Sequence, residues 1–287
     1  AGGMGRVADA FAGAARAAGA RVRTGCPVAR ILVDHGRACG VEVADGERLD
    51  ATLVISSADP KTTVFDLLGA RHIEAGFARR VHHLRMAGNA AKLHLALDAA
   101  PEFGGAPPDA LAGRLLIAPD MDYVEHAFNP AKYGRCSEQP VMEITVPSAA
   151  DPTLAPPGCH VLSAVVQYAP RFLEGGWDDE RTGAFRERVL DTLSAYAPGL
   201  RRHIVAAELL GPADIERIYR VRGGHWHHGE LALDQFLFTR PVPGATGYAL
   251  PVEGLWLCGA GTHPGGGISG AAGRNAAAEI LRREGRR

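Results

Sequence analysis

A glycine run near the C-terminus, GAGTHPGGGISG from Gly259 to Gly270, is the stretch best suited to binding chemistry. It follows a short apolar run, Leu255 to Cys258, that has the length and bounds of a strand. An alanine-rich run, Ala271 to Arg283, comes next and favours a helix. A strand, a glycine loop and a helix together bring backbone N–H groups and a helix N-terminus against a phosphate or an anionic ring. The pattern therefore indicates a site for an anionic cofactor.

Inside this run, Gly265, Gly267 and Gly270 spell G-x-G-x-x-G. The dinucleotide fingerprint with this spelling opens a βαβ unit, with a further strand and an acidic residue about 20 positions on. The sequence continues only to Arg287, so we expect the loop to close a cofactor site whose opening piece lies elsewhere. A second match, G-x-G-x-x-A from Gly3 to Ala8, has no strand before it and indicates a glycine entry into a helix.

Lys92 and the histidine segment GGHWHHGE are the other candidates for chemistry. Lys92 opens an apolar strand pattern, so it lies either at a solvated strand edge or near a redox cofactor, where it would hold a water or stabilise a reduced ring. His227 and His228 are adjacent and would point to opposite faces of an extended chain, so we expect no metal site. His228 or Trp226 facing a ligand in a pocket, and ordinary loop hydrogen bonding, are the alternatives that stay open.

Composition narrows the class of protein. The 31 basic and 32 acidic residues nearly balance, which gives no electrostatic case for a nucleic acid partner. No apolar run approaches the roughly 20 residues of a membrane-spanning helix. The five cysteines are scattered, odd in number and without C-x-x-C spacing, so neither a disulfide framework nor a zinc site is expected, and a cytoplasmic location fits best.

The elements that must position these residues alternate along the chain, which predicts an α/β (mixed α+β) fold. Helices are expected at 5–19, from Asp59-Pro60 onward, and at 73–84, 179–197, 212–219 and 271–283. Strands are expected at 21–25 and through a β-meander to residue 50, then in a more buried strand at 53–56, and at 92–97, 141–146, 161–168, 204–209 and 255–258. The segment 99–119 is rich in Pro, Gly and Ala and is expected to be loop. This order implies that 1–60 and 251–287 share one cofactor layer, with 61–250 as an inserted mixed-sheet domain for substrate.

The spans GGHWHHGELALDQFLFTRPVPG and PVEGLWLCGAGTHPGGGISGAAGRNAA, with the opening stretch from GGMGRVADAF to ISSADP, resemble the phytoene-desaturase-like FAD-dependent oxidoreductases over nearly the whole chain. Within that family they are most similar to the branch labelled pyridine nucleotide-disulfide oxidoreductase domain-containing protein 2. The resemblance implies a flavoprotein of the glutathione-reductase-2 type, related in fold to monoamine oxidase, with an FAD-binding Rossmann-like domain split along the sequence.

The resemblance also implies roles for individual residues. Val28 would meet the adenine end of FAD through its backbone, and Gly259, Ala260 and Gly261 would pass beside its ribityl–pyrophosphate region. Lys92 would lie near flavin N5, and His228 is a second catalytic candidate. The segment against the isoalloxazine would consist of Gly267, Ile268 and Ser269, with Gly266 also binding the cofactor.

Relatives in this family begin with a strand and a G-x-G-x-x-G loop that this sequence does not contain, so the resemblance is to their C-terminal portion. We therefore expect an incomplete FAD-binding domain and weak FAD binding by this chain alone. The leading function is FAD-dependent dehydrogenation of an apolar small molecule by hydride transfer to flavin. The alternative is a catalytically silent fragment for substrate binding or interaction, which needs a partner chain carrying the dinucleotide-binding half or forms a homo-oligomer.

Overall fold

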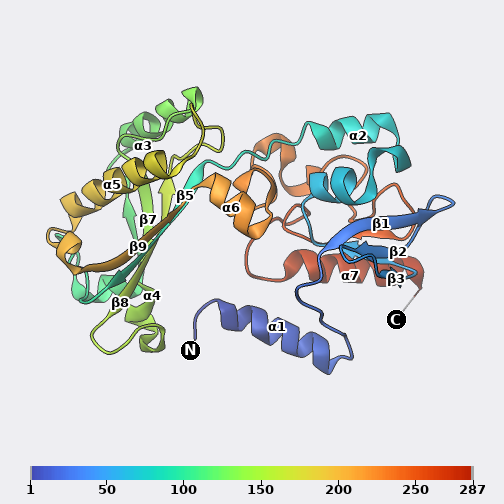
Figure 1. Cartoon of the computed structure of the whole chain (residues 1–287), viewed down its shortest axis with the longest axis horizontal. Coiled ribbons are helices and arrows are strands. Elements are labelled where there is room, and N and C mark those ends of the chain that lie inside the picture. Colours follow the sequence, from blue (N-terminus) through green and yellow to red (C-terminus); the bar gives the residue numbers. More distant parts are fainter. Residues whose placement is uncertain (1, 286–287) are drawn as a thin grey trace. The chain divides into compact units, whose positions relative to one another are not determined.

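The computed structural model describes residues 2–285, and the chain splits into two compact units, each made of two stretches (Figure 1). Unit 1 consists of Ala1–Val22 and Asn89–Asp214, and unit 2 of Arg23–Gly88 and Ile215–Arg287. The predicted division at residues 60 and 250 separates domains by function and stays a prediction. Residues 1 and 286–287, which that division includes, lie outside the described part of the chain.

Unit 1 is built on a five-stranded antiparallel sheet with the strand order β6-β7-β8-β5-β9. Its strands are β5 (Ala90–Leu97), β6 (Arg114–Ile117), β7 (Val141–Thr145), β8 (His160–Gln167) and β9 (Ile204–Leu210). Its helices are α1 (Gly5–Ala17), α3 (Met121–Phe128), α4 (Pro147–Ala150) and α5 (Asp179–Tyr196). A further helix, α6 (Pro212–Tyr219), begins in unit 1 and continues into unit 2.

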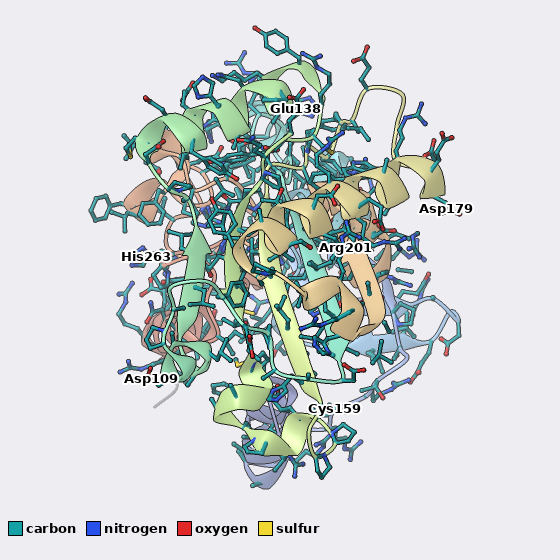
Figure 2. The ribbon with its side chains drawn as sticks, turned by 90° about the vertical axis from the view of Figure 1, so that its left-hand side faces the viewer. Asp109, Glu138, Cys159, Asp179, Arg201 and His263 are labelled. Carbon is teal, nitrogen blue, oxygen red and sulfur yellow. The ribbon has the colours of Figure 1, made fainter. Side chains whose placement is uncertain are left out.

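The core of unit 1 lies between one face of this sheet and α5 (Figure 2, where Asp179 marks the first residue of the helix). Along β5, alternate residues are buried because strand side chains point to opposite faces in turn. Leu93, Leu95 and Leu97 therefore face the core. The helix contributes one apolar stripe, formed by Phe185, Val189, Leu190 and Leu193.

Unit 2 contains a three-stranded antiparallel meander and a separate pair of parallel strands. The meander is β1 (Val28–Asp34), β2 (Arg37–Val43) and β3 (Arg48–Asp50); the parallel pair is β4 (Val54–Ser56) and β10 (Leu255–Leu257). The unit also contains a π-helical stretch η1 (Thr62–Leu68), α2 (Ala75–His82) and α7 (Ala271–Glu284). His35 and Gly36 join β1 to β2 with positive φ at both positions, as a two-residue hairpin turn of type I′ requires.

The parallel pair joins segments that are far apart in sequence. Val54 donates its N–H to the carbonyl of Gly254, and Cys258 donates to the carbonyl of Ser56. Leu255 and Leu257 are buried in a core that also contains residues of η1, α2 and the meander. On the opposite face of β10, Trp256 is buried against Ala276 and Ile280 of α7.

The mixed α/β class is confirmed, and most predicted elements occur within a few residues of their expected bounds. Three expectations are wrong. Residues 21–25 form no strand, since they are exposed and pair with no ladder. The expected loop 99–119 contains β6, whose four residues RLLI are held by the neighbouring β7 rather than by local pattern. The strand at 53–56 is less buried than expected, with Ile55 50% exposed. None of the described helices is long and apolar enough to cross a membrane.

Candidate cofactor site

The glycine loop after β10 lies directly against the chain that follows β4. A Cβ atom at Gly259 would stand 2.2 Å from the carbonyl oxygen of Ser57, so only glycine permits this approach. Thr262 closes the turn by donating its N–H and its hydroxyl to the carbonyl of Gly259. The carboxyl ends of two parallel strands therefore meet here, which is where open α/β sheets bind ligands.

The same loop contacts the histidine segment. A Cβ at Gly261 would lie 2.6 Å from Cδ of Pro60 and 3.4 Å from Cβ of His228. A Cβ at Gly266 would lie 2.5 Å from Nδ1 of His227. Two regions predicted separately from the sequence, the glycine run and the histidine segment, thus form one wall.

Beyond Gly266 the loop is exposed and carries few side chains. Gly267 has a φ of 128° and Gly270, the residue before α7, a φ of 67°, so both need glycine. The hydroxyl oxygen of Ser269 accepts the N–H of Ala271, the first residue of α7, at 3.3 Å. Ile268 is 66% exposed. The loop and the first turn of α7 therefore present backbone N–H groups with little in front of them.

The buried side chain of Arg240 links the glycine loop to the histidine segment. Its side chain is only 2% exposed, and its guanidinium donates to carbonyl oxygens alone. The acceptors are Ala260 at 3.1 Å, Gln235 at 3.2 Å, Gly229 at 3.3 Å, Glu230 at 3.4 Å, and His227. Within residues 2–285 no carboxylate pairs with it, and burial lowers its pKa. Sequence reasoning missed Arg240, although an arginine before proline in the apolar stretch FLFTRPVP is a signal that could have found it.

Burial favours the neutral form of the histidines beside Arg240, and two of these histidines, His225 and His228, have a ring nitrogen without a hydrogen-bond partner among the described residues. Burial, with smaller contributions from His227 and Arg240, lowers the pKa of His225 to about 4. Burial also lowers the pKa values of His227 and His228. Three buried Nδ1 atoms have no hydrogen-bond partner among the described residues, those of His225, His228 and His263. Unpartnered buried nitrogens are costly and uncommon, and a bound ligand is one way to satisfy them.

A pocket of about 600 Å³ opens beside this wall, entirely within unit 2. Its lining combines Val28 of β1, the residues from Ser56 to Asp59 after β4, and His228. The carboxylate of Asp59 stabilises the start of the following helical stretch, because it accepts hydrogen bonds from the N–H and the hydroxyl of Thr62. The structure thus brings Val28 and His228 to one pocket, with Gly261 in contact with His228.

Lys92 lies in unit 1, on the sheet face opposite α5. It is not at a sheet edge, since β5 is paired on both sides, with Val165 and Leu210 opposite Lys92. Burial lowers its pKa, while the charge of Glu143 acts the other way. His94 shares this face, and its Nδ1 lies 3.2 Å from the Ser163 hydroxyl. The role near flavin N5 stays a prediction.

The residues present fit a flavin nucleotide. Glycines 259, 261 and 266 let the loop pack closely against Ser57, Pro60 and His227, and the unpartnered imidazole nitrogens of His225 and His228 offer hydrogen bonds beside it. No group of three His, Cys, Asp or Glu residues suited to a metal ion occurs in the described part of the chain. Fold and site together define a protein of the flavin-binding α/β class.

Residues 1–281 match the family described as flavin containing amine oxidoreductase, and the chain belongs to this family. This confirms the predicted family and its flavin cofactor, FAD.

Curated relatives agree with that membership. The chain is 42% identical over 292 residues to pyridine nucleotide-disulfide oxidoreductase domain-containing protein 2 of Mus musculus, covering 98% of this chain and 50% of the relative. It is 29% identical to one of the subunits of a limonene dehydrogenase from Castellaniella defragrans, covering 97% and 54%, and 28% identical to a lycopene-forming phytoene desaturase of Paracoccus sp., covering 92% and 50%. The chain thus spans about half the length of the curated relatives that it matches.

Solved structures show the same fold. An oxidoreductase from Methanosarcina mazei matches with a TM-score of 0.57 at 22% identity, over 96% of this chain and 53% of that one. Cyclohexylamine oxidase from Brevibacterium oxydans matches with a TM-score of 0.53 at 13% identity, over 90% and 48%.

Proposed function

We propose that this chain supplies the flavin-side half of an FAD-dependent oxidoreductase that dehydrogenates an apolar small molecule. The observation that carries the proposal is the glycine loop, Gly259 to Gly270, which packs against the end of β4 and the histidine segment. The names of two relatives, a limonene dehydrogenase and a phytoene desaturase, support an apolar substrate.

Each candidate residue has a defined task in this proposal. The N–H groups of the loop and the N-terminus of α7 would hold the anionic parts of FAD, and Val28 would meet its adenine end through its backbone. Gly259, Ala260 and Gly261 would line the ribityl–pyrophosphate region, and Gly266 to Ser269 the ring. FAD, when bound, supplies the acceptor for a hydride from substrate. His228, held neutral by burial, can donate one hydrogen bond and accept another, and Lys92 would stabilise negative charge.

The test is an FAD titration of the purified chain, followed by visible absorbance and flavin fluorescence. Gly266→Ala places a methyl group against His227 and should weaken FAD binding at least tenfold. The matched control Gly13→Ala alters a glycine on α1 whose Cβ would meet nothing within 4 Å, and should leave binding unchanged. Equal FAD affinity of both variants under conditions in which wild type binds FAD would overturn the proposal, as would a wild-type chain that binds no FAD even when co-expressed with the N-terminal half of the mouse relative.

One observation favours the alternative, a chain that works only with a partner carrying the dinucleotide-binding half. Among residues 2–285, β4 pairs with β10 and with no strand on its other side, and Ile55 in its centre is 50% exposed, whereas parallel strands are usually buried on both faces. Co-expression with the N-terminal half of the mouse relative should then produce a complex that retains FAD. Stoichiometric FAD on the isolated chain would refute this alternative.

A further inference from the structure

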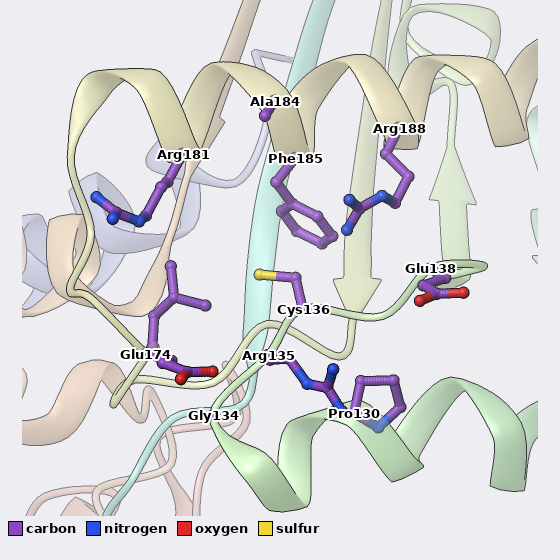
Figure 3. Close-up of a pocket in the computed structure, with 11 residues that line it drawn as sticks. Pro130, Gly134, Arg135, Cys136, Glu138, Glu174, Arg181, Ala184, Phe185 and Arg188 are labelled. Carbon is purple, nitrogen blue, oxygen red and sulfur yellow. The ribbon is translucent and has the colours of Figure 1, made fainter.

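A second pocket lies within unit 1 and has no part in the flavin proposal. It has a volume of about 390 Å³ and lies between the first half of α5 and the segments 130–138 and 173–174 (Figure 3). Pockets of this size accommodate small organic molecules. We propose that it binds a small monoanionic carboxylate with an apolar body, held by the guanidinium groups of Arg135 and Arg188.

The charges of the lining favour a monoanion. Three arginines and two glutamates line the pocket: Arg135, Arg181, Arg188, Glu138 and Glu174. With Asp178, which pairs with Arg181, the charges at the pocket sum to zero, so one carboxylate adds a single negative charge where a phosphate dianion would add two. A carboxylate also matches the planar guanidinium fork, which can donate two parallel hydrogen bonds to it.

Two of the three arginines have donors to spare. Arg181 is committed to Asp178, which accepts both its backbone N–H and its guanidinium. The guanidinium of Arg188 donates only to the carbonyl of Ser137, at 3.3 Å, and the side chain of Arg135 has no hydrogen bond or ion pair within residues 2–285. In the view of Figure 3, Arg188 and Arg135 lie above and below Cys136, while Glu174 lies on the side of Arg181.

The rest of the lining is apolar. Phe185 is 2% exposed, and Leu173, Ala184 and Pro130 complete the wall. Burial raises the pKa of the Cys136 thiol to about 12 even though Arg188 acts against it, so the sulfur stays protonated and serves as an apolar contact. Beside it, the hydroxyl of Ser137 is fully buried and has no partner among the described residues.

The test is a titration of the full chain with sodium benzoate, followed by NMR chemical shifts, with benzamide as the neutral isostere and inorganic phosphate as the dianion. Wild type should show saturable shifts at residues 134–138 and 184–188 with benzoate, and at least tenfold weaker binding of the other two probes. Arg188→Gln should weaken benzoate binding at least tenfold and Arg135→Gln at least threefold, while Arg188→Lys should fall between wild type and Arg188→Gln.

The matched control is Arg186→Gln, on the same helix but outside the pocket, where Arg186 faces Glu187. Its benzoate affinity should equal that of wild type. Absence of saturable binding by wild type, equal binding of benzoate and benzamide, or equal losses in Arg186→Gln and Arg188→Gln would each overturn the proposal. Because all probes bind without flavin, no outcome bears on the FAD proposal, and a colourless chain can still bind benzoate.

Discussion

Arg240 is a buried cation whose charge meets carbonyl dipoles instead of a carboxylate. Its five acceptors belong to the histidine segment, the stretch after it and the glycine loop, so one side chain fixes the position of the histidine segment against the glycine loop. Burying a charge is costly unless its hydrogen bonds are made, and here they are made by backbone groups that would otherwise be unsatisfied.

Replacing Arg240 should therefore destabilise unit 2. Arg240→Met leaves several buried carbonyls without donors, and we expect a loss of about 2–4 kcal/mol in the free energy of unfolding, since each orphaned group costs ~1–3 kcal/mol and some will admit water. Arg240→Lys keeps the charge with fewer donors and should lose about half as much. Urea unfolding followed by tryptophan fluorescence measures this. The exposed Arg282→Met is the control, and an equal effect of both methionine variants would contradict the assignment.

His225 should make stability depend on pH. Its pKa in the folded chain is about 4, below its ordinary value of 6.5, so the unfolded chain binds a proton first as pH falls. Stability is therefore fully present above pH 6.5 and decreases towards pH 4. The complete shift would be worth ~3 kcal/mol, and partial access of water to the ring reduces this to about 1–2 kcal/mol. The free energy of unfolding, measured at pH 4.5 and pH 7, should differ less between the two pH values in His225→Gln than in wild type. In the control His35→Asn, in an exposed turn, the difference should equal that of wild type.

At the scale of elements, the glycine loop depends on its contact with β4. Gly259→Ala would force the loop away from Ser57, whose backbone cannot yield as a flexible side chain would, and should cost about 1–3 kcal/mol. Gly273→Ala, in the exposed part of α7, should instead stabilise the chain by about 0.5–1 kcal/mol because alanine loses less backbone entropy in a helix. Thermal unfolding of the two variants should shift in opposite directions. A shift in the same direction would show that the close approach at Gly259 is relaxed in solution.

Elements with strong local patterns could be predicted from sequence, and those defined by their neighbours could not. The alternation along β5 and the apolar stripe of α5 have the periods of a strand and a helix, and both were predicted within a few residues. β6 has only four residues and exists because β7 pairs with it. Within the candidate site, the glycine run was visible because glycine marks close approach. Arg240 was not, because its importance comes from five carbonyls brought to it by the fold.

At the scale of the whole molecule, each unit has its own core, although each is made of two separate stretches of sequence. Leu193 of α5 is buried among the strands of unit 1, and Leu257 of β10 among the elements of unit 2. Leu→Ala at either site should cost about 2–5 kcal/mol, from lost burial and from the cavity left behind. Because no residue belongs to both cores, we expect each cost to fall on one unit.

Amide hydrogen exchange read by mass spectrometry tests this directly. Leu193→Ala should accelerate exchange in β5 and β8 and leave β4 and β10 at wild-type rates, and Leu257→Ala should do the reverse. The assay also follows the chain across its unit boundaries, since peptides on either side of residues 22, 88 and 214 should respond to different variants. If both variants accelerate exchange equally in all these strands, the two units unfold as one cooperative body and the separation of their cores has no thermodynamic consequence.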